Sequence, residues 1–204
     1  MMNPQKIGNN SLLLKCPDDH HPHAIDLGLP SGTKWCCCNV GATTPEGYGG
    51  YYAWGETSEK DMYNSDTYAY FYNGRIYLDI GSDIACTQYD VAYVLMGGSW
   101  RMPSLGQQVE LMDNCTRTWT NQNGVEGILV TGKNGGQIFL PAAGFLVDAD
   151  LYYEGCYGSY WSSSHEGLCD ELACYFDFGT GFGGFWNWDV TDRSIGQPVR
   201  AVCP

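Results

Sequence analysis

The chain has 204 residues, 44% of them hydrophobic, which suffices for a core and excludes an intrinsically disordered chain. Its 10 Lys and Arg are outnumbered by 23 Asp and Glu, so the formal net charge is −13 and the sequence pI is near 4.4. Binding to nucleic acid or to an anionic membrane surface is not expected, because both depend on Lys and Arg. No apolar run approaches the length of a membrane span, so direct membrane insertion is not expected either.

The first 23 residues lack hydrophobic periodicity, so we predict a flexible tail at 1–23 and one domain over 24–204. Four tail residues are of metal-ligating types: Cys16, His20, His21 and His23. Their crowding in a flexible segment indicates adventitious binding rather than a functional site. We therefore predict no metal site and no cofactor.

A β-like pattern begins at residue 24. Residues 24–29 alternate, a Pro-Ser-Gly turn signal follows, and residues 34–40 are predicted to return as a second strand. The polar, Tyr-rich stretch over 58–83 has little pattern and is predicted to be an irregular excursion.

The clearest helix is predicted to start after Ser104, a good N-cap, and to end near residue 115. Its apolar residues are spaced as on one helical face: Leu105, Val109, Leu111 and Met112. A shorter helix is expected near Asp90. Residues 127–131 and 137–141 then read as a hairpin across a Lys-Asn-Gly-Gly turn.

The last third is rich in glycine and aromatic residues and closes with an apolar alternation over 199–203. We predict that this strand lies beside the first strand, at 25–29. With its mixture of helices and short antiparallel strands, the chain is assigned to the α+β class as a single domain.

Large side chains beside glycine and small residues are predicted to be structural. An indole is more often buried than used to stack on a sugar, so the following tryptophans are predicted for the core: Trp35, Trp54, Trp100 and Trp161. Arg101 and Arg200 are predicted to be buried as well, because a guanidinium can make several fixed hydrogen bonds at once.

The patterns that would indicate catalysis or calcium binding are incomplete. The serine run at 162–164 lacks a Gly-x-Ser-x-Gly elbow, and His165 is the only histidine beyond the tail. The acidic stretch at 148–154 resembles a calcium loop, but Ser159 stands where the bidentate glutamate belongs. An enzyme is therefore not expected.

The ten cysteines include no Cys-x-x-Cys pair, so a zinc ribbon and a thioredoxin-type site are not indicated. Cys36, Cys37 and Cys38 are contiguous, and neighbouring residues of a strand face opposite sides, so the three cannot all join one simple disulfide framework. We expect mostly reduced, buried cysteines. One or two disulfides near the chain ends stay an alternative.

Seven ordered blocks of the chain resemble the Fibrobacter succinogenes major paralogous domain family, which is common in gut Bacteroidales and their phages. The blocks are IDLGLPSGTKW (25–35), CNVGA (38–42), YAWGET (52–57), GSWRMPS (98–104), FLPAAG (139–144), GSYWSSS (158–164) and GQPVRAVC (196–203). The chain departs from the pattern at Gln107 and Gln108, where an acidic and an aromatic residue are usual, and at Cys36 and Cys37, where smaller residues are usual.

The resemblance implies a C-type lectin-like fold of the formylglycine-generating-enzyme branch, which also contains the variable proteins of diversity-generating retroelements. It implies short antiparallel strands, one or two helices, much irregular loop and a C-terminal surface that displays a ligand site. Formylglycine chemistry needs a reactive cysteine constellation that the cysteines of this chain do not match.

The segment 165–195 is the predicted binding surface, because family-like blocks fix its ends while its interior follows the family only loosely. Within 173–178 we expect Phe176 and Phe178 to face the core, Cys174 and Asp177 to face elsewhere, and Tyr175 to lie on a rim. The predicted ligand-binding residues are His165, Cys174, Tyr175, Asp177, Phe182, Phe185, Asp189, Val190, Thr191, Asp192, Ser194 and Ile195.

Residue composition is compatible with diversification of this segment. Adenine randomisation of Asn codons cannot reach Lys, Gln, Met, Glu or Trp. The segment has no Lys, Gln or Met, and its exceptions are Glu166, Glu171, Trp186 and Trp188. An ordinary Gly-rich loop region is an equal alternative.

We therefore expect a non-catalytic receptor-binding or adhesion domain that presents this surface to a protein or a glycan, at a cell surface or on a phage particle. The alternative is a structural subunit of a cell-surface or fimbrial assembly that uses the same face for a permanent contact.

Overall fold

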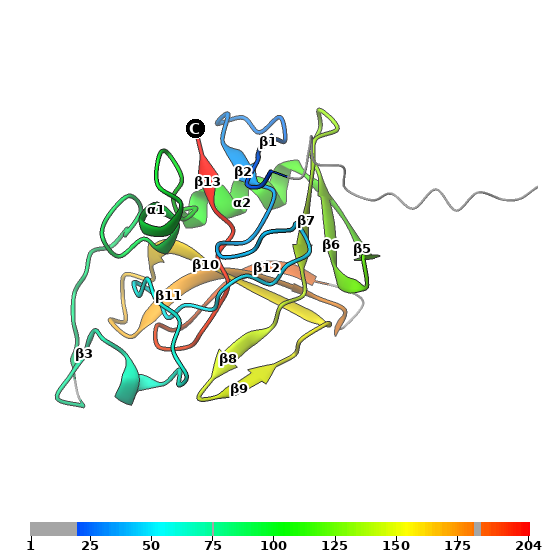
Figure 1. Ribbon diagram of the computed structural model, residues 1–204. Coiled ribbons are helices and arrows are strands. Elements are labelled where there is room, and N and C mark those ends of the chain that lie inside the picture. The colour runs from blue at the N-terminus through cyan, green and yellow to red at the C-terminus, as the bar shows by residue number, and fades with distance from the viewer. Residues whose placement is uncertain (1–19, 75, 182–184) are drawn as a thin grey trace, which may run out of the picture.

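The computed structural model describes residues 20–74, 76–181 and 185–204, which form mostly short antiparallel strands together with two short helices (Figure 1). The helices are α1 (Val91–Met96) and α2 (Leu105–Asn114), and a 3-10 turn covers Ser65–Thr67. The strands, grouped by sheet, are β1 (Ala24–Asp26), β2 (Lys34–Cys36) and β13 (Val202–Cys203); β3 (Phe71–Tyr72) and β4 (Ile76–Tyr77); β5 (Thr116–Gln122), β6 (Val125–Thr131) and β7 (Gln137–Pro141); β8 (Phe145–Val147) and β9 (Asp150–Tyr152); β10 (Tyr157–His165), β11 (Leu172–Gly179) and β12 (Phe185–Asp192). None of the helices in the described ranges is long and apolar enough to cross a membrane.

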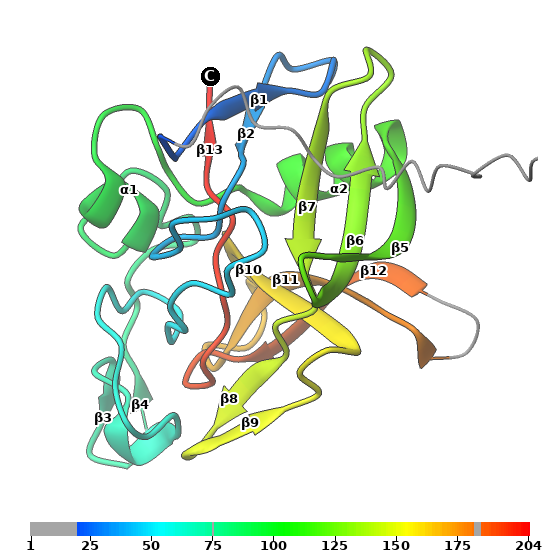
Figure 2. The ribbon, with the colours of Figure 1, turned by 45° about the vertical axis from the view of Figure 1, so that its right-hand side comes forward.

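The two ends of the predicted domain meet in one sheet. β2 pairs with β1 on one side and with β13 on the other, so the first and last strands flank it (Figure 2). The predicted proximity of the terminal strands is confirmed, although both strands are shorter than predicted. β1 stops because the Asp26 carboxylate accepts a hydrogen bond from the Gly28 N–H at 2.7 Å and Gly28 turns at φ 66°.

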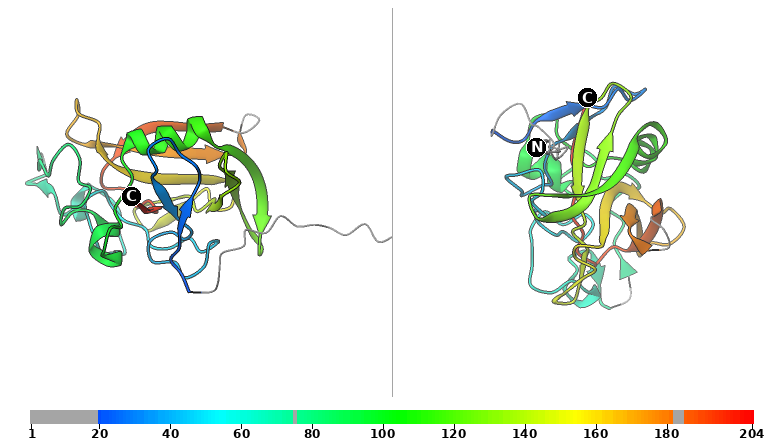
Figure 3. Two further views of the ribbon diagram at one scale, coloured as in Figure 1. Left: turned by 90° about the horizontal axis from the view of Figure 1, so that it is seen from above. Right: turned by 90° about the vertical axis from the view of Figure 1, so that its right-hand side faces the viewer.

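Helix α2 lies across the sheet β10–β11–β12 (Figure 3). Ser104 is its N-cap, as predicted, and forms a capping box with Gln107. The predicted apolar stripe is wrong in part, because Leu111 is its only fully buried member and Gln108 is buried beside it. The Gln108 amide donates to the carbonyls of Tyr160 and Trp161, at 3.1 Å each, so this polar residue anchors the helix to β10.

The predicted minor helix and hairpin are confirmed. α1 begins after Asp90, whose carboxylate caps Tyr93 N–H at 3.0 Å and also accepts from Met102 N–H. β6 and β7 pair in antiparallel register across the predicted turn.

The predicted tryptophan core is confirmed at three of four positions. Trp35, Trp54 and Trp161 are fully buried, whereas Trp100 is half-buried at the edge of a core cluster. Trp100 lies in a turn in which its backbone N–H donates to the Gly97 carbonyl, and this turn keeps the Trp100 indole at the surface.

Of the two arginines predicted to be buried, only Arg200 is. Its guanidinium donates to the side-chain oxygen of Asn39 and to the carbonyls of Cys36 and Phe139. Arg101 is half-buried, and its backbone, rather than its side chain, bridges to Val202. The prediction for Arg101 was wrong because its position is set by backbone pairing with Val202 and not by hydrogen bonds of its guanidinium.

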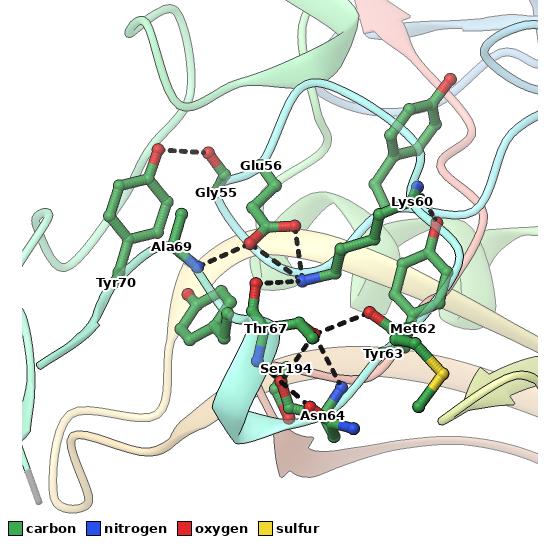
Figure 4. Close-up of polar contacts among 12 residues, drawn as sticks. Gly55, Glu56, Lys60, Met62, Tyr63, Asn64, Thr67, Ala69, Tyr70 and Ser194 are labelled. Carbon is green, nitrogen blue, oxygen red and sulfur yellow. Dashed lines mark hydrogen bonds and ion pairs between the residues drawn. The ribbon is translucent and has the colours of Figure 1, made fainter. Parts of the chain in front are cut away.

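The Tyr-rich excursion is irregular, as predicted, apart from the 3-10 turn and the two-residue strands β3 and β4, and a polar network fixes it (Figure 4). The Lys60 ammonium lies 2.8 Å from the Glu56 carboxylate and donates to Thr67 O at 3.1 Å, while Glu56 accepts from the Ala69 N–H at 2.8 Å. Tyr63 and Tyr68 are buried beneath it. Two tyrosines of the excursion therefore belong to the core, whereas Tyr72 is exposed.

All nine described cysteines are free thiols, and five of them are buried. The expectation of mostly reduced cysteines is confirmed for the described part of the chain, and Cys16 lies outside it. Burial was overestimated, since Cys86, Cys156 and Cys169 are exposed.

Candidate functional site: an aromatic pocket beside the β8–β9 hairpin

A pocket of about 430 Å³ lies between the β8–β9 hairpin and one face of the sheet β10–β11–β12. Its lining combines aromatic, aliphatic and small polar side chains: Phe145, Val147, Tyr153, Tyr157, Ser159, Tyr175, Thr191, Ile195 and Gln197. The hairpin projects below the sheet as a separate arm, so the pocket forms where this arm meets the sheet (Figure 1).

Strand alternation explains which residues of the sheet reach the pocket. Ser159 lies opposite Asp177, Trp161 opposite Tyr175, and Tyr175 opposite Asp189 in the antiparallel registers. Directly opposed residues share a face, and alternate residues of one strand do too. Tyr175 therefore lines the pocket and Asp177 lies on the same face of the sheet, while Phe176 and Phe178 face the core under α2, as predicted.

The hairpin side of the pocket is an aromatic cluster. The Phe145 ring lies 5.8 Å from the Tyr153 ring and 5.9 Å from the Tyr157 ring, and Tyr153 and Tyr157 are 6.0 Å apart. These spacings are typical of interacting aromatic pairs. Tyr153 is nevertheless 61% exposed, so a large part of the cluster faces solvent.

The floor of the pocket contains polar groups that are only partly satisfied. The Ser159 hydroxyl donates to the Gln197 side-chain oxygen at 2.7 Å, and the Tyr157 hydroxyl donates to one Asp177 oxygen at 2.8 Å. The Gln197 amide nitrogen and the other Asp177 oxygen are buried without a hydrogen-bond partner among the described residues. An unpaired buried polar group costs about 1–3 kcal/mol, so a ligand that pairs with these groups gains that energy.

Burial also raises the pKa values of titratable side chains in and beside the pocket. Removal from water raises the pKa of Asp177 above its usual range, and the nearby charge of Asp189 adds to the effect. Burial likewise raises the pKa of Tyr157 and of Tyr175, so both phenols stay protonated and act as hydrogen-bond donors.

The structure divides the predicted site residues into several groups. Those that line the pocket are Tyr175, Thr191 and Ile195. Asp177 and Asp189 share the pocket face of the sheet, but Asp177 is buried rather than exposed. Phe182 lies outside the described residues, and the same holds for the side chain of Phe185.

The other predicted site residues do not line the pocket. Cys174 and Phe176 are alternate residues of β11 and therefore point to the same face of the sheet. Cys174 is also buried, so the expectation that it faces away from the core is wrong. Ser194 is buried too, because its N–H is held by the Asp192 carboxylate at 2.8 Å in a turn. His165 ends β10, with its ring 5.8 Å from that of Trp54.

Two further predicted residues are engaged elsewhere. Val190 lies opposite Cys174, on the α2 side of the sheet. Asp192 accepts a hydrogen bond from the Tyr77 hydroxyl at 3.0 Å, which ties β12 to the excursion.

Arg193 is a structural residue that the sequence reasoning missed within the predicted binding segment. It is 1% exposed and donates to the Tyr68 hydroxyl and to the carbonyls of Leu78 and Asp170. Its guanidinium also lies 4.8 Å from the centre of the Trp54 ring. Arg193 therefore fixes the end of β12 against the excursion.

The hairpin residues were missed as well. Their signal was the aromatic spacing of Tyr152, Tyr153 and Tyr157 next to the acidic stretch that was examined only as a calcium loop. Asp148 instead occupies the hairpin turn at φ 52° and accepts from the Asn64 amide at 2.6 Å.

No family model matches the chain, and comparisons with curated proteins and with solved structures gave no match either.

Proposed function

We propose that this protein is a non-catalytic ligand-binding domain whose binding site is the aromatic pocket. The observation that carries the proposal is the Gln197 amide nitrogen, buried without a partner at the floor of a pocket walled by Phe145, Tyr153 and Tyr157. Concave sites with apolar walls and a few convergent polar groups are typical of ligand binding.

The proposed fold is C-type lectin-like, of the formylglycine-generating-enzyme branch, and the proposed setting is a cell surface or a phage particle. Support comes from the ordered sequence blocks, from the shared sheet of the first and last strands, and from α2 packed on the sheet β10–β11–β12. A binding rather than catalytic role is favoured by the bonding of Ser159, whose hydroxyl donates to an amide oxygen and not to a base.

The pocket favours a glycan as ligand. Its volume of about 430 Å³ suits a small number of sugar rings. Aromatic faces can stack on sugar C–H groups, while the Gln197 amide supplies a donor for a hydroxyl.

A protein ligand is the second candidate, favoured by the rim of the pocket. The hairpin exposes Leu151, Tyr152 and Tyr153 side by side, an arrangement that packing within the domain does not require. Tyrosines on a rim are typical anchors of protein interfaces. A permanent contact of this rim would make the chain a structural subunit.

Diversification of the site, as in retroelement variable proteins, is supported by the position of β12. This strand is the edge of its sheet, and Asn187 and Asp189 are exposed on its pocket face. Substitutions there leave the core under α2 unchanged.

The test is a combined glycan and protein array probed with the full chain and two single variants. Tyr153→Ala removes an exposed aromatic of the pocket, and Trp188→Ala removes a 46% exposed aromatic on the opposite face of the same sheet. We expect Tyr153→Ala to weaken binding of an array ligand by about 2 kcal/mol or more, as for an interface anchor, and Trp188→Ala to leave it unchanged. Equal binding by all three proteins would contradict the proposed site, and a subunit that co-purifies at fixed stoichiometry would favour the structural role.

A further inference from the structure

Two histidines and one cysteine lie together at the terminal sheet. His21, His23 and Cys37 each offer a ligand atom, and these three atoms all lie within 4.8 Å of one another. The group shares no residue with the aromatic pocket, and the β1–β2 strands and the β8–β9 hairpin lie at opposite ends of the molecule (Figure 2).

Sheet register builds this group. Ala24 lies opposite Cys36, and the pairing continues one residue further, where Cys37 N–H donates to His23 O at 3.0 Å. Opposed residues of an antiparallel pair share a face, which places the His23 ring beside the Cys37 sulfur. His21 precedes His23 by two residues and so falls on the same side of the extended segment.

The distances suit tetrahedral coordination by a zinc-type ion. The Cys37 sulfur lies 3.3 Å from His21 Nδ1 and 3.7 Å from His23 Nδ1. Zinc–sulfur bonds of about 2.3 Å and zinc–nitrogen bonds of about 2.1 Å, at a tetrahedral angle, separate sulfur from nitrogen by about 3.6 Å. The two sulfur–nitrogen distances are therefore close to those that such an ion requires.

The Cys37 sulfur is also held as an acceptor. The His23 N–H points at it from 3.0 Å, and the Cys38 sulfur lies 3.5 Å away.

We propose that His21, His23 and Cys37 form a site for a thiophilic divalent cation of the zinc type. Two imidazoles and a thiolate match the preference of zinc, and the fourth tetrahedral position is left to water or to the Cys38 sulfur. The bound ion fastens the segment before β1 to the end of β2. The proposal differs from the expectation that the tail histidines bind metal only adventitiously, because Cys37 belongs to the domain.

The test is zinc binding to the metal-free full chain, measured by competition with a chromophoric chelator. We expect one zinc per chain, and at least about 100-fold weaker binding in His23→Ala and in Cys37→Ala, because each loses a direct ligand. The matched controls are His20→Ala, which removes the adjacent exposed histidine, and Cys36→Ala, which removes the adjacent buried thiol. Both controls and Cys16→Ser should bind zinc as the wild type does.

Cobalt gives a second readout that does not depend on stability. Cobalt bound to the wild type should show a thiolate-to-metal charge-transfer band, and Cys37→Ala should lack it while retaining the native circular dichroism spectrum. Loss of zinc binding in His20→Ala or Cys16→Ser, with full binding in Cys37→Ala, would overturn the proposal and leave only an adventitious tail site. Absence of the cobalt band in the wild type would also overturn it.

Discussion

The two faces of the sheet β10–β11–β12 are made by the same strands and have opposite properties. The face under α2 carries Tyr160, Phe176 and Phe178, all fully buried, with the Tyr160 and Phe176 rings stacked at 5.3 Å. The other face carries Tyr175 and Asp177 and is bounded by the β8–β9 hairpin, with buried polar atoms that lack partners. Buried polar atoms without a partner among the described residues occur on both faces, Gln108 Oε1 and Trp186 Nε1 under α2 and Asp177 Oδ1 on the other, and it is the second face that borders the pocket.

This difference shows how a scaffold and a site can be combined in three strands. Because side chains alternate, substitutions on the pocket face leave the packing under α2 intact. The pocket face also contributes to a core cluster through Trp161 and Ala173, so the comparison predicts a separation of stability and ligand binding only between the α2 face and the residues that line the pocket.

The largest expected effect is on the α2 face. Phe178→Ala should lower the free energy of unfolding by about 3–5 kcal/mol, as for a fully buried phenylalanine, because Tyr160 and Trp186 lose their packing partner. Chemical denaturation measures it. A loss below about 1 kcal/mol, which is closer to the cost of a surface substitution, would mean that this face is not the core.

A smaller loss is expected where the binding segment is fixed to the excursion. Arg193→Lys keeps the charge but removes the planar fork that reaches Tyr68, Leu78 and Asp170. An acceptor left unpaired should cost about 1–3 kcal/mol, visible as a lower melting temperature. An unchanged melting temperature would show that the lysine ammonium of the variant satisfies the acceptors that Arg193 reaches.

The pH dependence of stability separates the pocket face from the core. Burial raises the pKa of folded Asp177 above its unfolded value, so its contribution to stability is present below the ordinary value of 3.8 and is lost as pH rises through the folded pKa. Asp177→Asn stays neutral and lacks this loss. The stability of the variant relative to wild type should therefore increase from acid to neutral pH in denaturant titrations, and a constant difference would contradict a raised pKa.

The smallest stability effect is expected at the exposed edge. Asp189→Ala should change the free energy of unfolding by no more than about 0.5 kcal/mol, because Asp189 is exposed and its side chain accepts a hydrogen bond from the adjacent Val190 N–H. Thermal melting checks this, and a larger loss would place Asp189 in a structural network.

The sequence predicted the elements that depend on local signals. The Ser104 cap, the short helix after Asp90 and the hairpin of β6 and β7 were all correct, because capping and turn chemistry act over a few residues. Tyr175 was also placed correctly on a rim.

Contacts between distant segments were not predictable. The pocket joins Phe145 and Tyr153 to Gln197, and Arg193 is buried only because Tyr68 and Leu78 approach it from the excursion. The error at Cys174 was avoidable, since strand alternation alone places it with Phe176.

The account is tested most directly by the double variant Ser159→Ala/Gln197→Met. It removes both partners of the pocket-floor hydrogen bond and the unpaired amide nitrogen, replacing them with apolar groups of similar size. Because no partner is left behind, the melting temperature should be equal to or above that of the wild type, while affinity for an array ligand should fall at least about tenfold, or roughly 1.4 kcal/mol. Full affinity together with native stability would contradict the claim that these buried polar groups are kept for a ligand.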